Sequence, residues 1–306
     1  MSWKSRANAV LSGIAGVKLV RDDGSAYAGR QGPGPARAKG GAASARRRKL
    51  TRVTDEMVRT PVHPEVDRLL HKPVFVLSPV RSGSTLLRYV MGAHSRLHAP
   101  HEMHVRRLTV QFTTRLSEKS MTVLGHNQAD LEHLLWDRVM HRELALSGKE
   151  FFVDKTPSNA FVHHRIATAW PDARFVFLIR HPASIAASWA EASAGRRTRE
   201  EAVLDALRYM KAVQRAREDL TGLTVRYEHL TAEPEVETRR ICEFLEVDWE
   251  PEMLEYGSEG GVFDKGLGDW TDKIQSGEIQ RGRPLPDATQ IPEPLHDISR
   301  AWGYLD

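Results

Sequence analysis

The 306-residue sequence contains one cysteine, Cys242, so no disulfide can form within a single chain. No apolar run approaches the ~18 residues that a membrane-spanning helix needs. These absences exclude a disulfide-stapled secreted domain, predict no membrane span or anchor, and favour the reducing cytoplasm as the location. Because Cys242 falls in a helical pattern with Ile241 and Phe244, we expect a buried core thiol.

The lysine of a nucleotide-hydrolysing phosphate loop is also missing. The apolar run 74–77 ends in Ser78-Pro79-Val80-Arg81-Ser82-Gly83-Ser84-Thr85, and an amphipathic run follows at once. This order predicts a strand, a turn and a helix whose first N–H groups bind phosphate or sulfate. Of the pattern G-x-x-x-x-G-K-[ST], only Gly83 and Thr85 remain. The remaining cation is Arg81, whose guanidinium can grip an anion; an ordinary serine-rich turn is the alternative.

A second predicted strand end carries another pair of anion-binding side chains. The apolar run 174–179 is typical of a strand buried on both faces, and Arg180 follows it directly. Pro182 suits the first turn of the next helix, and Ser188 lies one to two turns into that helix. Ligands of parallel sheets bind at the carboxyl ends of strands. Two anion sites at two such ends predict a nucleotide with phosphate at both ends.

These motifs resemble the sulfotransferases that use 3′-phosphoadenosine 5′-phosphosulfate (PAPS). Residues 79–87 are similar to the family's 5′-phosphosulfate loop, and the Arg180–Ser188 pair is similar to its 3′-phosphate pair. Residues 225–230 resemble its Arg-Tyr-Glu-Asp-Leu strand end, with His229 in the acidic place. The resemblance implies an α/β fold, a mostly parallel central sheet flanked by helices of the P-loop-NTPase-like sulfotransferase type. It also implies PAPS as donor and no metal ion.

The resemblance also implies which residues bind the donor. The expected donor-binding residues come from the loop 79–87, from the Arg180–Ser188 pair and from residues 225–230. They are Arg81, Ser82, Gly83, Ser84, Thr85, Leu86, Arg180, Ser188 and Tyr227. Residues 267–274 resemble a late cofactor-contacting loop in which tyrosylprotein sulfotransferases have Ser-Lys-Trp. Gly268 and Asp269 replace that Ser and Lys here. Trp270 and Lys273 remain as cofactor or lid residues, with Trp270 as a packing anchor the alternative.

Sulfuryl transfer needs a base for the acceptor hydroxyl, and Glu102 is our candidate. It follows Arg81 by 21 residues, the distance of the catalytic Glu in tyrosylprotein sulfotransferases. Its segment also resembles a Pro-x-Glu-Leu-His pattern in sulfotransferase domains of some bacterial polyketide synthases. His101 and His104 are alternative bases, and a simple ion pair of Glu102 with Arg106 is the structural alternative. The histidine spacing fits no strong zinc motif.

Lys155 and Arg81 are the other expected catalytic residues besides Glu102. Residues 151–153 read as a short buried strand, which Asp154-Lys155-Thr156-Pro157 closes before a helix. The family often has a Lys here that faces the sulfonate and the bridging oxygen, where negative charge builds up on the leaving group. Pairing of Lys155 with Asp154 or a surface acid is the alternative.

Alternating strand and helix patterns predict a mostly parallel sheet without internal repeats. The expected strands lie near 74–78, 151–154, 174–179 and 223–227. The expected helices lie near 84–95, 129–147, 158–169, 183–194, 199–218, 233–246 and 250–256. The insertion 103–147 should cover the active edge and shape the acceptor pocket. Its candidate specificity residues are Arg106, Arg107, Arg115, His126 and Trp136.

The net charge of +4 is unevenly distributed. Residues 1–50 hold 11 Lys and Arg against 2 Asp, and the rest holds 33 against 38 Asp and Glu. We therefore expect a basic, largely disordered arm over residues 1–60 and one catalytic domain over residues 61–306. Residues 12–20 can form a short amphipathic piece inside the arm. The arm can bind nucleic acid or an acidic partner or stay solvated, whereas the acidic remainder disfavours nucleic acid as a substrate.

Three functions compete on these patterns. The motifs favour a PAPS-dependent sulfotransferase acting on a hydroxyl of a small-molecule or carrier-tethered acceptor, in secondary metabolism. A P-loop small-molecule kinase is disfavoured by the missing lysine and the missing metal-binding acid. A noncatalytic nucleotide-binding protein is disfavoured by the joint presence of Arg81, Glu102 and Lys155. The sequence does not predict the oligomeric state.

Overall fold

The structure is a computed structural model that describes residues 17–21, 52–256, 277 and 279–306. The chain forms two compact units. One comprises residues 1–58 and 106–133, and the other comprises residues 59–105 and 134–306. The three strand ends that carry the predicted anion-binding and catalytic residues all belong to the second unit.

A five-stranded sheet forms the centre of the second unit. Its order is β3 (Leu97–His98), β5 (Phe151–Asp154), β2 (Val74–Leu77), β6 (Arg174–Ile179) and β7 (Leu223–Arg226). Every neighbouring pair is parallel, so the predicted parallel α/β sheet is confirmed. The four expected strands all form, because each is a short β-branched or aromatic run bounded by polar residues. The two-residue strand β3 is too short to leave such a pattern.

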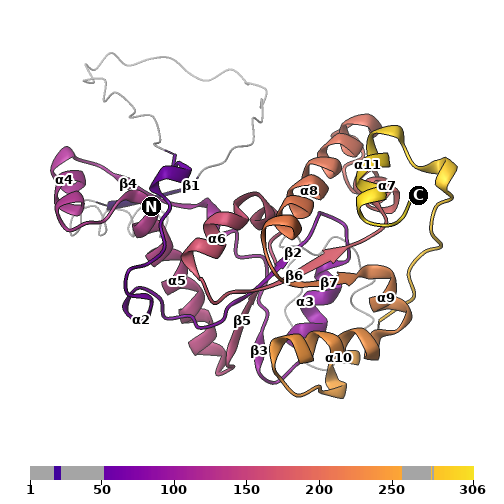
Figure 1. Ribbon diagram of the computed structural model, residues 1–306, viewed down its shortest axis with the longest axis horizontal. Helices are drawn as coiled ribbons and strands as arrows, with labels where there is room; N and C mark the ends of the chain where they lie inside the picture. Colours follow the sequence, from indigo (N-terminus) through magenta and orange to yellow (C-terminus); the bar gives the residue numbers. More distant parts are fainter. Residues whose placement is uncertain (1–16, 22–51, 257–276, 278) are drawn as a thin grey trace, which may run out of the picture. The chain divides into compact units, whose positions relative to one another are not determined.

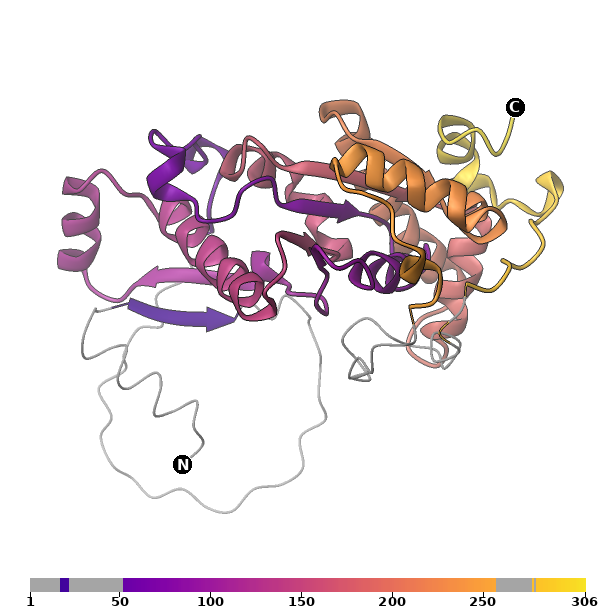
Figure 2. The same ribbon diagram turned by 90° about the horizontal axis from the view of Figure 1, so that it is seen from below.

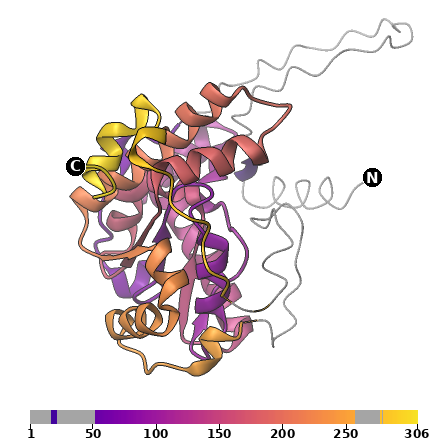
Figure 3. The same cartoon turned by 90° about the vertical axis from the view of Figure 1, so that its right-hand side faces the viewer.

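Helices cover both faces of this sheet. Along β2, Val74 and Val76 pack with α3 (Ser84–Gly92) and α10 (Pro234–Leu245). Alternate side chains point to opposite faces of a strand, and Phe75 accordingly packs against Trp170 instead. A second core joins α7 (Pro182–Ala192), α8 (Arg199–Asp219) and α11 (His296–Ala301). Figure 1 and Figure 3 show α10 and these three helices on opposite sides of the strands.

The remaining helices differ in part from those expected. The range 158–169 divides into a 3-10 helix, η3 (Pro157–Val162), and α6 (His163–Ala169). The range 250–256 forms only the short η4 (Pro251–Leu254). Tyr227 begins a helix, α9 (Tyr227–Ala232), instead of ending a strand. The others are α2 (Pro64–Asp67), α5 (Gln128–Ser147), η1 (Asp55–Met57), η2 (Val105–Arg107), η6 (Ala288–Gln290) and η7 (Glu293–Leu295).

The first unit contains a two-stranded antiparallel sheet of β1 (Val17–Arg21) and β4 (Leu108–Phe112). Figure 2 shows the two arrows side by side. Helix α4 (Arg115–Val123) follows, and its N-cap Thr114 accepts a hydrogen bond from the Ser117 amide. Strand β1 lies inside the stretch that we expected to be a disordered arm, most of which is outside the described residues. The boundary near residue 60 therefore stays a prediction.

Two expectations from composition can be compared with the structure. Cys242 is buried in the core, with its thiol next to the sulfur of Met253, as predicted. Burial raises the pKa of the thiol to about 11, so it stays protonated at neutral pH. None of the helices in the described part of the chain has the length and apolar character of a membrane span.

Candidate active site

The loop between β2 and α3 is a sharply bent turn. Ser82 donates a hydrogen bond through its hydroxyl to the Pro79 carbonyl over 2.8 Å. Arg81 and Gly83, on either side of Ser82, have φ values of 60° and 88°. Both values lie in the left-handed region, which glycine adopts readily and other residues rarely adopt. Helix α3 then starts at Ser84, and its first N–H groups have no intrahelical partner. An anion is the ligand that such a helix start favours.

Tyr227 explains why glycine is needed at position 83. A Cβ atom added to Gly83 would lie 2.2 Å from Cδ2 of Tyr227, well inside contact distance. Tyr227 stands directly after β7, so the end of this strand packs against the loop that follows β2. The guanidinium of Arg180 lies 4.4 Å from the centre of the same tyrosine ring. The ring therefore supports both the loop and the arginine.

The two predicted anion sites are joined by hydrogen bonds. Arg180 donates from Nη1 to the Arg81 carbonyl over 3.0 Å. Arg81 donates from Nε to the Ser188 hydroxyl over 3.1 Å. The Nε of Arg180 is buried and has no hydrogen-bond partner within the described residues. Since an unsatisfied buried donor is costly, this atom is available to a polar ligand.

Glu102 and Lys155 form a buried ion pair. Lys155 donates from Nζ to Oε1 of Glu102 over 2.6 Å, and the side chains of Lys155 and Glu102 are 0% and 13% exposed. Nε2 of His104 lies 3.3 Å from the other carboxylate oxygen of Glu102, Oε2. Burial alone would raise the pKa of Glu102, but the hydrogen bond from His104 and the charge of Lys155 lower it to about 2. Burial lowers the pKa of Lys155.

Asp154 fixes the backbone around Lys155. Its two carboxylate oxygens accept hydrogen bonds from the Thr156 hydroxyl and the Asn159 amide, both over 2.8 Å. These two hydrogen bonds lower the pKa of Asp154, but burial raises it by more. The Thr156 oxygen also lies 3.4 Å from the amide nitrogen of His104. These residues tie the histidine-rich segment to the end of β5, a role that the sequence patterns did not predict.

A cavity of about 580 Å³ opens at the carboxyl ends of β2, β6 and β7. Five of the predicted donor residues from the loop line it, as do Arg180, Ser188, Tyr227, Glu102 and His104; the five are Arg81, Gly83, Ser84, Thr85 and Leu86. Ser82 and Lys155 are buried next to these residues. His101 is exposed, and its Nδ1 lies 3.2 Å from the Glu102 carbonyl. Three strand ends thus converge on one cavity.

The profile of the Sulfotransferase family matches residues 73–251, more than half of the chain. The chain belongs to the sulfotransferase family. Two solved structures share its fold. The sulfotransferase domain from the curacin biosynthetic pathway is 21% identical with a TM-score of 0.55, and the match covers 78% of this chain and 100% of that one. The sulfotransferase domain from the Synechococcus PCC 7002 olefin synthase is also 21% identical, with a TM-score of 0.56 and a match over 81% of this chain and 98% of that one.

Curated relatives match over shorter stretches. An uncharacterized protein of Aquifex aeolicus is 24% identical over an alignment of 209 residues, and the match covers 60% of this chain and 27% of that protein. The nodulation protein NoeE of Sinorhizobium fredii is 28% identical over an alignment of 126 residues, and the match covers 37% of this chain and 30% of that protein. The chain therefore spans less than a third of the length of these two relatives. The family match confirms the resemblance drawn from the motifs, and the matched range contains Arg81, Glu102, Lys155 and Arg180.

Several cavity residues of this sulfotransferase were missed from the sequence. The wall also includes aromatic side chains from α7, from α8 and from the segment after η4, and a polar stretch at residues 280–283. They are Trp189, Tyr209, Tyr256, Gln280, Arg281 and Arg283. Arg283 donates to Glu191 of α7 over 3.3 Å, across the cavity wall. The closely spaced Arg281 and Arg283 are a basic signal that could have been noticed.

Other expected residues lie elsewhere. Trp270 and Lys273 are outside the described residues. Trp136 is buried, with the guanidinium of Arg165 4.0 Å from the centre of a ring of its side chain. Arg106, Arg107, Arg115 and His126 belong to the first unit. Their role in acceptor selection, and the pairing of Glu102 with Arg106, stay predictions.

Proposed function

We propose that this sulfotransferase moves a sulfonate group from PAPS to a hydroxyl of a small-molecule or carrier-tethered acceptor. The observation that carries the proposal is the cavity in which the loop Arg81–Leu86, the Arg180–Ser188 pair and Glu102 meet. One nucleotide with an anion at each end fits that pattern of donors. The adjoining carboxylate supplies the base that an attacking hydroxyl needs.

The donor set fits a nucleotide of this kind. The loop and the start of α3 offer backbone N–H groups to the 5′-phosphosulfate. Arg180 and Ser188 offer a guanidinium and a hydroxyl to the 3′-phosphate. The buried Nε of Arg180 and the buried hydroxyl of Ser158 have no partner within the described residues, and a polar ligand would satisfy both. Tyr227 contributes an aromatic face to the same cavity.

In the proposed reaction the acceptor oxygen forms a bond to sulfur while the bond from sulfur to the phosphate oxygen breaks. Glu102 takes the hydroxyl proton, with His104 or His101 as the alternative base. Lys155 and Arg81 oppose the negative charge that develops on the departing oxygen. No external oxidant or reductant is involved, and the products are the sulfated acceptor and 3′-phosphoadenosine 5′-phosphate. The protein's part is to orient the groups and to hold or move one proton.

The Glu102–Lys155 ion pair implies that the donor binds before Glu102 can act as a base. With a pKa of about 2, Glu102 is a weak base while His104 and Lys155 are both bonded to it. A sulfonate placed next to Lys155 would share the ammonium charge, and the basicity of Glu102 would rise. The base would then become effective once the donor is bound.

The acceptor is proposed from the shape of the wall and from the relatives. Trp189, Tyr209 and Tyr256 give the cavity an aromatic side suited to an apolar acceptor body. The structural neighbours are domains of a curacin pathway and of an olefin synthase, which supports a role in secondary metabolism. The single buried cysteine supports a cytoplasmic location.

Calorimetry with adenosine 3′,5′-bisphosphate and with ATP tests the donor assignment. We expect the bisphosphate to bind at least ~10-fold more tightly than ATP. Tighter binding of ATP would favour a kinase instead. Transfer of labelled sulfonate from PAPS to a mixture of hydroxyl acceptors tests catalysis, and binding without transfer to any hydroxyl class would favour a noncatalytic protein.

A further inference from the structure

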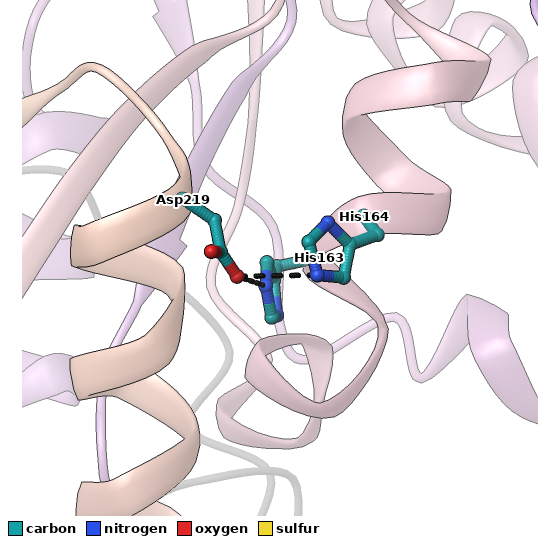
Figure 4. A group of neighbouring side chains, drawn as sticks. All are labelled: His163, His164 and Asp219. Carbon is teal, nitrogen blue, oxygen red and sulfur yellow. Dashed lines mark hydrogen bonds and ion pairs between the residues drawn. The ribbon is translucent and has the colours of Figure 1, made fainter.

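Two histidines and one aspartate meet at a point outside the described cavity wall. His163 and His164 are the first two residues of α6, and Asp219 is the last residue of α8. The Nε2 atoms of the two histidines lie 2.8 Å and 3.1 Å from the same carboxylate oxygen, Oδ2 of Asp219. Figure 4 shows both rings directed toward this carboxylate.

The contacts of His163 place one ring nitrogen on a carbonyl and the other on the Asp219 carboxylate. Its Nδ1 lies 2.9 Å from the Ala160 carbonyl, which can only accept, so Nδ1 carries a proton. A neutral imidazole has one proton, and its Nε2 would then point a lone pair at the anionic oxygen of Asp219. A metal-binding histidine has this same arrangement, with one nitrogen donating to a carbonyl and the other facing the ion. A cation between Nε2 of His163 and Oδ2 of Asp219 would satisfy both atoms.

We propose that His163, His164 and Asp219 bind a divalent transition-metal ion of the zinc class. Ligand atoms at ~2.0–2.1 Å from a tetrahedral ion are ~3.3 Å apart, so the distances here need only a small outward shift. All three ligand atoms lie within 4.8 Å of one another. Two imidazoles and one carboxylate suit zinc, nickel or copper better than magnesium or calcium. The side chain of His164 is 72% exposed, which leaves a coordination position open to water.

The position of the ion suggests a structural role. It would join the start of α6 to the end of α8, and the carbonyl that His163 contacts belongs to η3. Two residues of η3, Pro157 and Ser158, line the cavity. The ion would therefore hold a wall of the cavity without taking part in the reaction. A carboxylate at the C-terminal end of a helix is unfavourable next to the negative end of the helix dipole, and a cation there compensates for it.

Metal titration of the untagged, chelator-treated full chain tests the site. We expect one Zn²⁺ per chain to bind with a dissociation constant below ~10 μM, and Co²⁺ to give the visible absorption of a tetrahedral complex. His164→Ala and Asp219→Asn should each weaken binding at least ~10-fold. His164 is exposed, so its replacement should not impair folding. The matched control is His63→Ala, which removes an exposed histidine 3.6 Å from Glu65 that lacks a third ligand within the described residues.

Stability gives a second readout that does not depend on catalysis. Zn²⁺ should raise the melting temperature of the wild type and of His63→Ala but not that of Asp219→Asn. Equal Zn²⁺ affinity in wild type, His164→Ala and Asp219→Asn would overturn the proposal, as would no binding at ~100 μM Zn²⁺. In either case the cluster would be a hydrogen-bonded group of side chains that holds no metal ion. The result is independent of whether the protein uses PAPS.

Discussion

Lys155 donates a hydrogen bond of 2.6 Å to Glu102, and the lysine side chain has no exposed surface. Two residues that the sequence assigns to separate steps are thus one electrostatic unit. Removing either partner leaves the other charge buried, which typically costs about 3–5 kcal/mol. Every test of either role must therefore measure folding as well as turnover.

Glu102→Gln should separate catalysis from binding. The substitution keeps the shape and removes the carboxylate, so affinity for adenosine 3′,5′-bisphosphate should stay near wild type while kcat falls ~10²-fold or more. Glu191→Gln is the control, because this carboxylate lines the same cavity but is paired with Arg283. Its kcat should change less than ~3-fold. A wild-type rate for Glu102→Gln would make Glu102 structural and His104 or His101 the leading base.

The depressed pKa of Glu102 predicts a pH dependence of stability. Its folded value of about 2 lies below the ordinary 4.5, so the stabilisation from His104 and Lys155 is present above pH 4.5 and is lost as the pH falls toward 2. The full contribution is about 3 kcal/mol. Urea unfolding of wild type and Glu102→Gln should show a difference that shrinks between pH 6 and pH 3. A constant difference would contradict the low pKa.

An activated phenol should distinguish the two catalytic roles. An acceptor of low hydroxyl pKa needs less help from a base, so it should restore the turnover of Glu102→Gln more than that of Lys155→Ala. Lys155→Ala lacks stabilisation of the leaving oxygen, which does not depend on the acceptor. The comparison requires the turnover of both variants with an unactivated alcohol and with the phenol. Equal rescue of both variants would remove the distinction between their roles.

Arg180→Ala should weaken binding of the 3′-phosphorylated nucleotide by ~1.5–3 kcal/mol. The analogue without the 3′-phosphate should lose much less, and calorimetry with the two nucleotides measures the difference. Arg174→Ala is the matched control, since Arg174 begins the strand that Arg180 follows and contacts Glu246 at the opposite edge. Equal losses for both nucleotides would exclude Arg180 from the 3′-phosphate site.

Gly83→Ala should disrupt the loop in two ways. The new methyl group would meet the Tyr227 ring at 2.2 Å, and φ of 88° is strained for any side chain. We expect a loss of ~1–3 kcal/mol in unfolding free energy and a larger loss of nucleotide affinity. Gly125→Ala, at φ 84° with open space around it, isolates the cost of the dihedral angle alone. A Gly83→Ala protein no less stable than Gly125→Ala would show that Tyr227 moves aside freely.

The sequence predicts the parallel sheet and the loop well for a physical reason. Buried parallel strands are continuous apolar runs, and Arg180 directly follows one such run while Arg81 lies in the loop after another. Strands β1, β3 and β4 were missed because they gain their stability from a partner strand, which a local pattern does not reveal. Tyr227, which was expected to bind the donor, packs against Gly83 of the loop and starts a helix instead of ending a strand.

The contacts between distant residues could not be predicted in the same way. Glu102 and Lys155 are 53 residues apart, and Arg81 and Ser188 are 107 apart. Family resemblance gave each residue a role, but only packing shows that their side chains bond to one another. The same holds for His163 and Asp219, 56 residues apart, where no local motif marks the cluster.

The hydrogen bonds from Arg180 to Arg81 and from Arg81 to Ser188 have a thermodynamic consequence. An anion that draws Arg81 toward one end of the cavity competes with its bond to Ser188, and an anion at the other end acts on the same bond through Arg180. The free energies for the two halves of a nucleotide are therefore coupled. The affinity of the whole ligand will not equal the product of the affinities of its fragments.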